Sequence, residues 1–339
     1  MEKRNIPIIK TPFINLQSDF GFKRAFGSKK FKKVVIKFIR AAMGDEINIK
    51  RVVPHELNYH DKEILPSIEK GKRILYDVYF TLNIPKDNSG LKSYHIQKEE
   101  REMDIEHHFI FEMQNVYSPP LEDRMAYYAF KSVTEQGKTG WNYDLNPVIL
   151  ICLTDFDFPH LSKRLIHDFE LREKETGEIL TRKLRILFYS LKHVANEWEK
   201  CENDLERQLF LIKNMDKMDK NSKPYIEGGY KEYFEAAESD NIVGEEAVAY
   251  SQSLEHLQEV QAGLDFRYDQ GYAIGEQRGM AIGKQEGIAI GKQEGIAIGE
   301  ARGEQRERIS LARRMKSRGY DAFTISDITG IPLREIEAL

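Results

Sequence analysis

Two carboxylates in apolar, strand-like surroundings are the residues of this sequence best placed to do chemistry. Asp77 lies within residues 72–81 and Glu112 within residues 108–115, and both segments are rich in the β-branched and aromatic residues that favour strands. Burying an unpaired carboxylate costs several kcal/mol, so each acid should face solvent or share a cation. On neighbouring strands, the two acids could hold one divalent metal ion.

The elements that must position these acids follow from the hydrophobic pattern. Residues 18–43 predict one helix, or two, with Ser18 or Asp19 as the N-cap. Residues 121–136 predict an amphipathic helix, and the apolar run 146–154 predicts a strand buried on both faces. The charged residues 85–106 indicate a long hairpin excursion, and residues 162–171 and 182–191 indicate a later hairpin. The resulting order of helix, strands, helix and strand predicts an α/β core.

Composition narrows the class of protein. The chain has 339 residues, of which 41 % are hydrophobic, and this supports a sizeable core and more than one domain. Two cysteines, Cys152 and Cys201, cannot form a disulfide framework and suit a reducing compartment. We find no apolar run long enough to cross a bilayer and no secretory h-region, so we expect a cytoplasmic protein without a membrane partner.

A basic surface is expected near the N-terminus, although the formal net charge of the chain is only −4. Residues 1–51 hold 13 Lys or Arg against 4 Asp or Glu, and the eight cations in residues 20–40 meet no acid within that segment. A solvated helix face remains the alternative, but the imbalance favours an anionic partner such as a nucleic-acid backbone. The lysines that we predict to contact it are Lys23, Lys29, Lys30, Lys32 and Lys33.

Glycine stands at every fourth position from Gly271 to Gly303, and the triplets between the glycines alternate apolar and charged. Nine glycines would cost a helix about 9 kcal/mol relative to alanine. A glycine line lets a second helix approach closely, and a repeat of four residues favours right-handed winding. A self-associating helical arm that makes a homo-oligomer and a repeat-expanded linker are both open interpretations.

The sequence resembles the Rpn family of recombination-promoting nucleases and putative transposases, within the PD-(D/E)xK nuclease superfamily. Four features carry the resemblance: residues 18–27, Asp77 followed by Glu112-x-Gln114, residues 124–128, and the glycine repeat with its closing residues 328–330. The resemblance implies a restriction-endonuclease-like αβββαβ core with a helical C-terminal extension. It also implies a metal-dependent DNA endonuclease.

Site roles follow from the same resemblance. Asp77 and Glu112 would hold Mg²⁺, with Mn²⁺ as the alternative, because carboxylates are the ligands that magnesium prefers. Gln114 stands where the superfamily has lysine, Tyr76 replaces the proline of its motif, and Asp19 matches a helical acid of the family. Arg124 would bind phosphate on the helix that follows. Asp19 has an equally good interpretation as a helix cap.

Other interpretations remain open at this level. His107 and His108 are adjacent on a strand and therefore point to opposite faces, so they predict no metal site. We predict a nuclease-like domain at 1–192, a peripheral helical region at 193–265, the arm at 266–304 and a small helical end-cap at 305–339. The alternative function is a catalytically weak or inactive nuclease fold that binds DNA and oligomerises.

Overall fold

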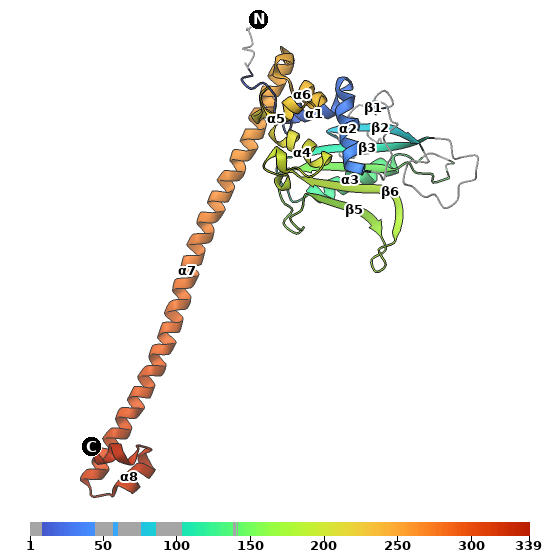
Figure 1. Cartoon of the computed structure of the whole chain (residues 1–339). Coiled ribbons are helices and arrows are strands. Elements are labelled where there is room, and N and C mark those ends of the chain that lie inside the picture. Colours follow the sequence, from blue (N-terminus) through green and yellow to red (C-terminus); the bar gives the residue numbers. More distant parts are fainter. Residues whose placement is uncertain (1–8, 45–56, 60–75, 86–103, 138–139, 141) are drawn as a thin grey trace, which may run out of the picture. The chain divides into compact units, whose positions relative to one another are not determined.

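The structure is a computed structural model that describes residues 9–44, 57–59, 76–85, 104–137, 140 and 142–339. Its centre is a six-stranded sheet with the order β1-β2-β3-β4-β6-β5 (Figure 1). The strands are β1 (Leu57–Tyr59), β2 (Val78–Pro85), β3 (Asp104–Gln114), β4 (Val148–Thr154), β5 (Ile166–Arg172) and β6 (Ile179–Ser190). Strands β1, β2 and β3 are antiparallel neighbours, whereas β3, β4 and β6 run parallel. Strand β5 closes the sheet as the antiparallel partner of β6.

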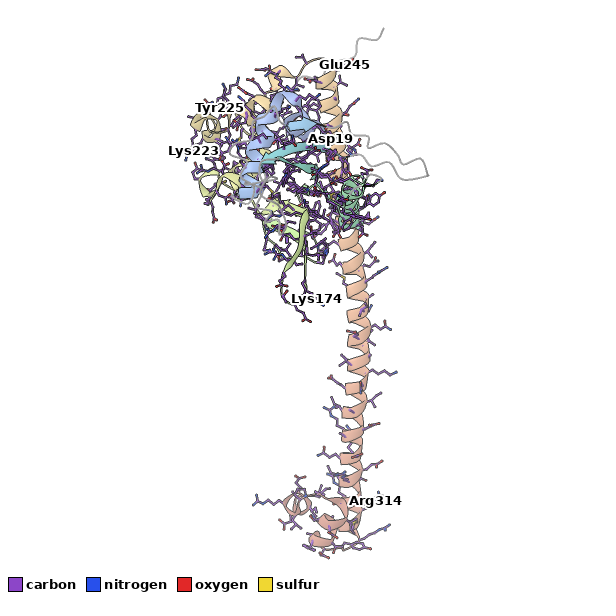
Figure 2. The ribbon with its side chains drawn as sticks, turned by 90° about the vertical axis from the view of Figure 1, so that its right-hand side faces the viewer. Asp19, Lys174, Lys223, Tyr225, Glu245 and Arg314 are labelled. Atoms are coloured by element: carbon purple, nitrogen blue, oxygen red, sulfur yellow. The ribbon has the colours of Figure 1, made fainter. Side chains whose placement is uncertain are left out.

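Helices precede, interrupt and follow these strands. They are α1 (Asp19–Gly27), α2 (Lys32–Met43), α3 (Leu121–Thr134), α4 (Asp204–Asn214), α5 (Lys223–Glu227), α6 (Lys231–Ala237), α7 (Glu245–Ser317), α8 (Ala322–Thr329) and α9 (Leu333–Glu337). The order α1 and α2, three strands, α3 and β4 confirms the predicted αβββαβ core. The predicted hairpin of β5 and β6 is also confirmed, and the tip that carries Lys174 projects from the sheet (Figure 2).

Alternation along β3 divides the core into two layers. Phe109 and Phe111 face a cluster built with α1, α2, α4 and α6, whereas Ile110 faces a second cluster built with α3. Every residue of β4 is buried, as predicted for a strand with helices on both faces. Glu112 lies two residues after Ile110 and therefore belongs to the α3 side.

The predicted excursion at 85–106 is the connection of a hairpin. Pro85 pairs with Asp104 at its two ends, and the residues between, 86–103, lie outside the described residues. The pairing continues from there to Val78 and Phe111 without a shift of register. The strands β2 and β3 are therefore direct neighbours in the sheet, although the connection between them is long.

The helical region at 193–265 is not peripheral. Leu209 and Leu211 of α4, Tyr233 of α6 and Tyr250 of α7 lie in the same hydrophobic cluster as α1 and α2, and each is at most 3 % exposed. The sequence did not reveal this because the exposed faces of these helices are heavily charged. The chain divides into two compact units, Met1–Ala262 and Gly263–Leu339.

Within the second unit, α7 is helical through the whole glycine repeat, and its side chains stand outward along the segment that leads to Arg314 (Figure 2). Helices α8 and α9 pack on the end of α7 through a small cluster that contains Met315, Ile325 and Ile336. Among the described helices, none combines the length and the apolar character that crossing a membrane would require.

His107 is expected to make stability depend on pH. Its side chain is 1 % exposed, and burial lowers the pKa of His107 to about 4. Between that value and the ordinary pKa of about 6.5, the unfolded chain binds more protons than the native one, so stability falls as pH falls through this range. Urea titrations at pH 7 and pH 4.5 measure how much the free energy of unfolding falls between these two pH values. We expect this fall to be smaller in His107→Leu than in the wild type, by on the order of 2–3 kcal/mol.

The matched control for this prediction is His160→Leu, because the His160 side chain is 60 % exposed. An unchanged pH dependence in His107→Leu would contradict the assignment. A similar loss in the His160 variant would show that the effect is not specific to burial.

Candidate active site

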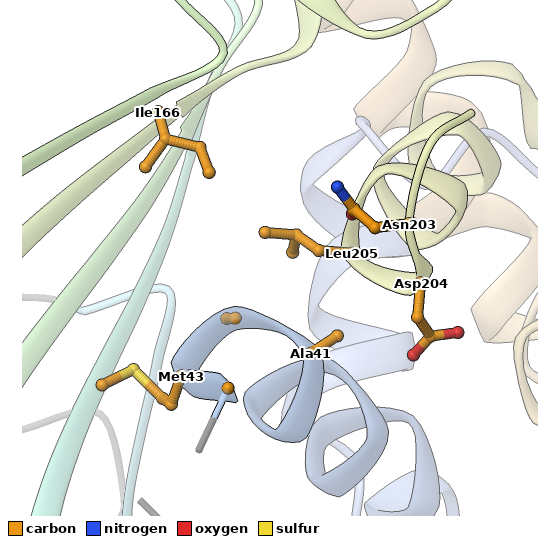
Figure 3. Close-up of a pocket in the computed structure, with 8 residues that line it drawn as sticks. Ala41, Met43, Ile166, Asn203, Asp204 and Leu205 are labelled. Carbon is orange, nitrogen blue, oxygen red and sulfur yellow. The ribbon is translucent and has the colours of Figure 1, made fainter. Parts of the chain in front are cut away.

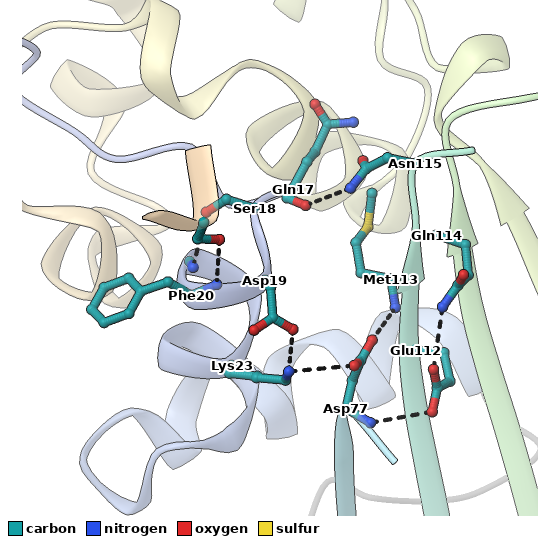
Figure 4. Close-up of polar contacts among 12 residues, drawn as sticks. Gln17, Ser18, Asp19, Phe20, Lys23, Asp77, Glu112, Met113, Gln114 and Asn115 are labelled. Atoms are coloured by element: carbon teal, nitrogen blue, oxygen red, sulfur yellow. Dashed lines mark hydrogen bonds and ion pairs between the residues drawn. The ribbon is translucent and has the colours of Figure 1, made fainter. Parts of the chain in front are cut away.

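The sheet brings the two predicted acidic residues into contact through backbone N–H groups. The backbone N–H of Asp77 donates to Glu112 Oε1 at 3.2 Å, and the backbone N–H of Met113 donates to Asp77 Oδ2 at 3.0 Å (Figure 4). Because Val78 is paired with Phe111, Asp77 stands immediately before the first paired residue of β2. Asp77 was predicted inside a strand over 72–81. Instead, the strand begins after it, and residues 72–75 lie outside the described residues.

Burial makes this pair electrostatically costly when both groups are ionised. Glu112 is 3 % exposed, and burial followed by the charge of Asp77 raises its pKa well above the ordinary value. The Asp77 side chain is 21 % exposed, and its pKa is also raised, chiefly by burial and against the hydrogen bond from Met113. Two close carboxylates with raised pKa values are the arrangement that a bound cation would stabilise.

Lys23 provides a cation beside the pair. Its ammonium group lies 3.6 Å from Asp77 Oδ1 and also forms an ion pair with Asp19 (Figure 4). Lys23 was predicted among the nucleic-acid-binding lysines, and this role beside the carboxylates was missed. The sequence signalled only the ion pair of Lys23 with Asp19, because residues four apart on a helix face each other. Asp19 itself is largely exposed, with 60 % of its side chain accessible.

The start of α1 is fixed by a tight turn. Ser18, rather than Asp19, is the N-cap, and its hydroxyl accepts from the backbone N–H of Gly21. A Cβ on Gly21 would meet the Asn15 carbonyl oxygen at 2.0 Å, so only glycine fits at that position. The Asn115 amide donates to the Gln17 carbonyl at 2.9 Å and ties this turn to the end of β3. These contacts hold Asp19 and Lys23 near the carboxylates.

Gln114 connects the carboxylates to a partly buried cation on α3. Its amide nitrogen donates to Glu112 Oε2 at 3.3 Å, and Arg124 Nη2 donates to the Gln114 amide oxygen at 2.7 Å. Arg124 Nε is buried and has no hydrogen-bond partner among the described residues. The Arg124 guanidinium therefore places a positive charge at this end of β3, although residue 114 itself is neutral.

Tyr76, which replaces the motif proline, is a core residue. It is 1 % exposed, and its hydroxyl donates to the Tyr128 carbonyl at 3.2 Å. The Tyr76 and Tyr128 rings pack edge to face with centroids 5.2 Å apart. This contact anchors the residue before Asp77 to α3. Tyr127, by contrast, is 49 % exposed.

The predicted basic surface is partly neutralised by acids that are distant in the sequence. Arg24 pairs with Glu246 at 2.9 Å, and Lys37 pairs with Glu232 at 2.8 Å. Four of the predicted lysines lie in or beside the short 3₁₀ turn between α1 and α2: Lys29, Lys30 and Lys33 are exposed, and Lys32 is half-buried. Lys30 also lies over the Phe31 ring, 5.2 Å from its centroid.

Two hollows of the described surface differ in the chemistry they offer. One, of about 360 Å³, is lined by Asp19, Lys23 and the first turns of α7, so it adjoins the carboxylates. The other, of about 460 Å³, lies between the end of α2, Ile166 and the start of α4 (Figure 3). Its polar groups already have structural partners, because Asn203 caps α4 and Asp204 accepts from Gln208. The second hollow therefore offers no competing chemistry.

The described residues contain no group of three or more His, Cys, Asp or Glu side chains arranged to hold a metal ion. The candidate centre thus rests on two carboxylates. His107 and His108 take no part in it: His107 faces its backbone neighbour Ile105, and His108 contacts the Tyr79 hydroxyl.

Comparison with known proteins identifies the core. The family model described as "PD-(D/E)XK nuclease family transposase" matches residues 99–266. The chain belongs to this family. The matched segment, about half of the sequence, contains Glu112, Gln114 and Arg124, and structural contact adds Asp77 and α1 to it. Searches of curated proteins and of solved structures gave no match.

Proposed function

We propose that the chain is a metal-dependent DNA endonuclease whose centre is the Asp77–Glu112 pair. The contact between the buried Glu112 and the partly exposed Asp77 carries the proposal. The carboxylate of each accepts a hydrogen bond of 3.2 Å or less from a backbone N–H at or next to the other residue, within a nuclease-family core. Their raised pKa values fit a site completed by Mg²⁺ or Mn²⁺, because a divalent cation relieves the repulsion that burial strengthens. Such a cation, bound by both carboxylates, would polarise a phosphodiester and acidify a water.

The protein groups around the pair have separate tasks. Lys23, 3.6 Å from Asp77 Oδ1, neutralises part of the acidic charge and keeps Asp19 nearby. Gln114 orients the Glu112 carboxylate through its amide. Arg124 is only partly buried, so its guanidinium is suited to hold a phosphate oxygen of DNA. Its Nη2 keeps the Gln114 amide oriented at the same time.

The test is supercoiled plasmid incubated with purified full-length protein, with Mg²⁺, with Mn²⁺ and with chelator. Nicking that requires metal supports an endonuclease. DNA binding without nicking under any metal would favour the second candidate, a nuclease fold that binds DNA without cutting it. The observation that favours this second candidate is the neutral Gln114, because an amide can orient water but cannot stabilise hydroxide by charge.

DNA affinity should depend on salt through the exposed lysines of the α1–α2 connection. Neutralising one lysine that binds a phosphate reduces the log–log salt slope by about 0.9, so Lys29→Gln, Lys30→Gln and Lys33→Gln together should reduce it by about 3. Fluorescence anisotropy of labelled duplex from low to physiological salt measures the slope.

The matched control for the lysine variants is Lys223→Gln, an exposed lysine of α5 that is paired with Glu199. The control should leave the slope unchanged. An unchanged slope in the triple variant would show that this surface is merely solvated.

A further inference from the structure

The glycines of α7 have no explanation within the described part of the chain. None from Gly271 to Gly303 has a positive φ, and no atom lies within 4 Å of a Cβ built at any of them. Glycine is the least favourable helix residue after proline. A structural reason for repeating it must therefore come from outside this helix.

The eight triplets between the glycines follow a strict rule. Four are apolar at both ends, and all of these ends are between 45 % and 66 % exposed. They are Tyr272 and Ile274, Met280 and Ile282, Ile288 and Ile290, and Ile296 and Ile298. The middle residue of every triplet is Ala or Gln. Exposed apolar side chains repeated along one helix indicate a surface that is covered in the working protein.

The other four triplets carry opposite charges at their two ends. They are Glu276 and Arg278, Lys284 and Glu286, Lys292 and Glu294, and Glu300 and Arg302. Residues two apart do not face each other on a helix, whereas residues three or four apart do. None of these eight residues has an opposite charge three or four positions away. Their complementarity is therefore not used within α7.

A parallel copy of the same helix would use it. In a pair that meets along the glycines, the first residue of each triplet flanks one side, the third flanks the other, and the middle residue points away. When the two helices are parallel, the side of one helix that carries the first residues of the triplets lies beside the side of the other helix that carries the third residues. Glu276 then meets Arg278 of the second copy, Lys284 meets Glu286, and the apolar triplets meet one another.

Other arrangements bring like charges together. An antiparallel pair sets equivalent flanks side by side, so Glu276 approaches Glu300 and Lys284 approaches Lys292. A parallel pair shifted by one eight-residue unit sets Glu276 against Glu286. The shifted pair is mismatched because the two outer charged triplets begin with Glu and end with Arg, whereas the two inner ones begin with Lys and end with Glu. Direction and register are therefore both encoded, in the way that flanking charges select partners in coiled coils.

We propose that two copies of this chain associate through residues 271–303 as a parallel, in-register, right-handed helix pair. Four helical residues turn by about 400°, so the glycine line drifts about 40° per repeat and must wind right-handed to stay in contact. Glycine-lined helices cross in this sense at about −40°. The missing Cβ atoms allow the close approach, and the apolar side chains and charge pairs flank it.

Charge exchange in the full-length chain tests the register. One variant carries Lys284→Glu and Lys292→Glu, and the other carries Glu286→Lys and Glu294→Lys. We expect the wild type to sediment as two chains, each variant alone to dissociate at least about tenfold more readily, and an equimolar mixture to recover the two-chain mass. The control, Gln285→Glu with Gln293→Glu at middle positions, should behave as the wild type. A single-chain wild type, variants that associate normally, or a mixture that stays dissociated would overturn the proposal.

Spin labels test the direction of the pair. Labels at Gln277→Cys and, separately, at Ala301→Cys should each give a short same-site distance in a parallel pair; Cys152 and Cys201 are buried and should not react. An antiparallel pair centred on Ala289 would separate the labels at 277 by about 35 Å at the helical rise of 1.5 Å per residue. That result would overturn the proposal.

Alanine at the glycines tests close approach. Gly283→Ala, Gly287→Ala and Gly291→Ala should leave helix content by circular dichroism equal or higher, since the described chain leaves space for each Cβ. Association should weaken at least about tenfold. Retention of the wild-type mass would show that the glycines do not line the interface.

Discussion

Glu112→Gln is expected to raise the melting temperature of the metal-free protein and to abolish the further rise that Mn²⁺ gives the wild type. The Glu112 carboxyl is buried against Asp77, and its pKa is raised by burial and then by that charge. A carboxyl whose pKa is raised in the native state makes the protein less stable as pH rises above the pKa of the unfolded state, so at pH 7 the buried Glu112 carboxyl costs stability relative to a neutral side chain. A neutral amide that saves about 1–2 kcal/mol should raise the melting temperature by roughly 2–8 °C.

Metal should distinguish the two proteins. A ligand at 100 times its dissociation constant stabilises the native state by about 2.7 kcal/mol. The wild type should gain this stabilisation from Mn²⁺, whereas Glu112→Gln should not. Differential scanning calorimetry with and without Mn²⁺ measures the difference. Equal metal stabilisation of both proteins would place the metal elsewhere.

Restoring the superfamily lysine, Gln114→Lys, is expected to lower rather than raise activity. Arg124 Nη2 lies 2.7 Å from the Gln114 amide oxygen, so a lysine ammonium would enter beside a partly buried guanidinium. Like charges at such a distance disfavour each other strongly away from water. We expect a loss of at least about tenfold in cleavage rate, together with a lower melting temperature, because positive charge at this position displaces Arg124.

A compensating change gives the matched comparison. Adding Arg124→Gln to Gln114→Lys removes the second cation and should recover melting temperature relative to Gln114→Lys alone. Activity should recover less, because Arg124 is also the proposed phosphate contact. A tenfold gain in cleavage rate from Gln114→Lys alone would show that Arg124 does not occupy this space in the working protein.

Local pattern was enough to predict the order of elements and the main candidates. The alternation around Glu112 and Gln114, and the apolar run that became β4, carry the signal for a sheet covered on both faces. These patterns indicated an α/β core, and the family match supports the nuclease core that the resemblance implied. The excursion at 85–106 indicated a hairpin, but the register that sets Asp77 beside Glu112 came only from the observed pairing of β2 with β3.

Contacts between distant elements explain what the sequence did not reveal. Arg124 meets Gln114 because α3 packs over β3, and Lys23 meets Asp77 because the turn at Gly21 fixes α1. The helices after residue 193 were predicted to be peripheral because many of their residues are charged. Their apolar faces are narrow, such as the one that contains the buried Tyr233. In each case the position of the residue depends on a contact with an element that is distant in the sequence, and a local pattern does not show such a contact.

The central claim is that the Asp77–Glu112 pair makes this fold a metal-dependent nuclease. Its most direct test is plasmid nicking by wild type, Asp77→Asn, Glu112→Gln and Glu106→Gln in Mg²⁺ or Mn²⁺. Glu106 is the matched control, since it lies on the same strand with 43 % of its side chain exposed. We predict that both site variants lose at least about 100-fold in rate and that Glu106→Gln keeps the wild-type rate. Equal nicking by all four proteins would contradict the claim.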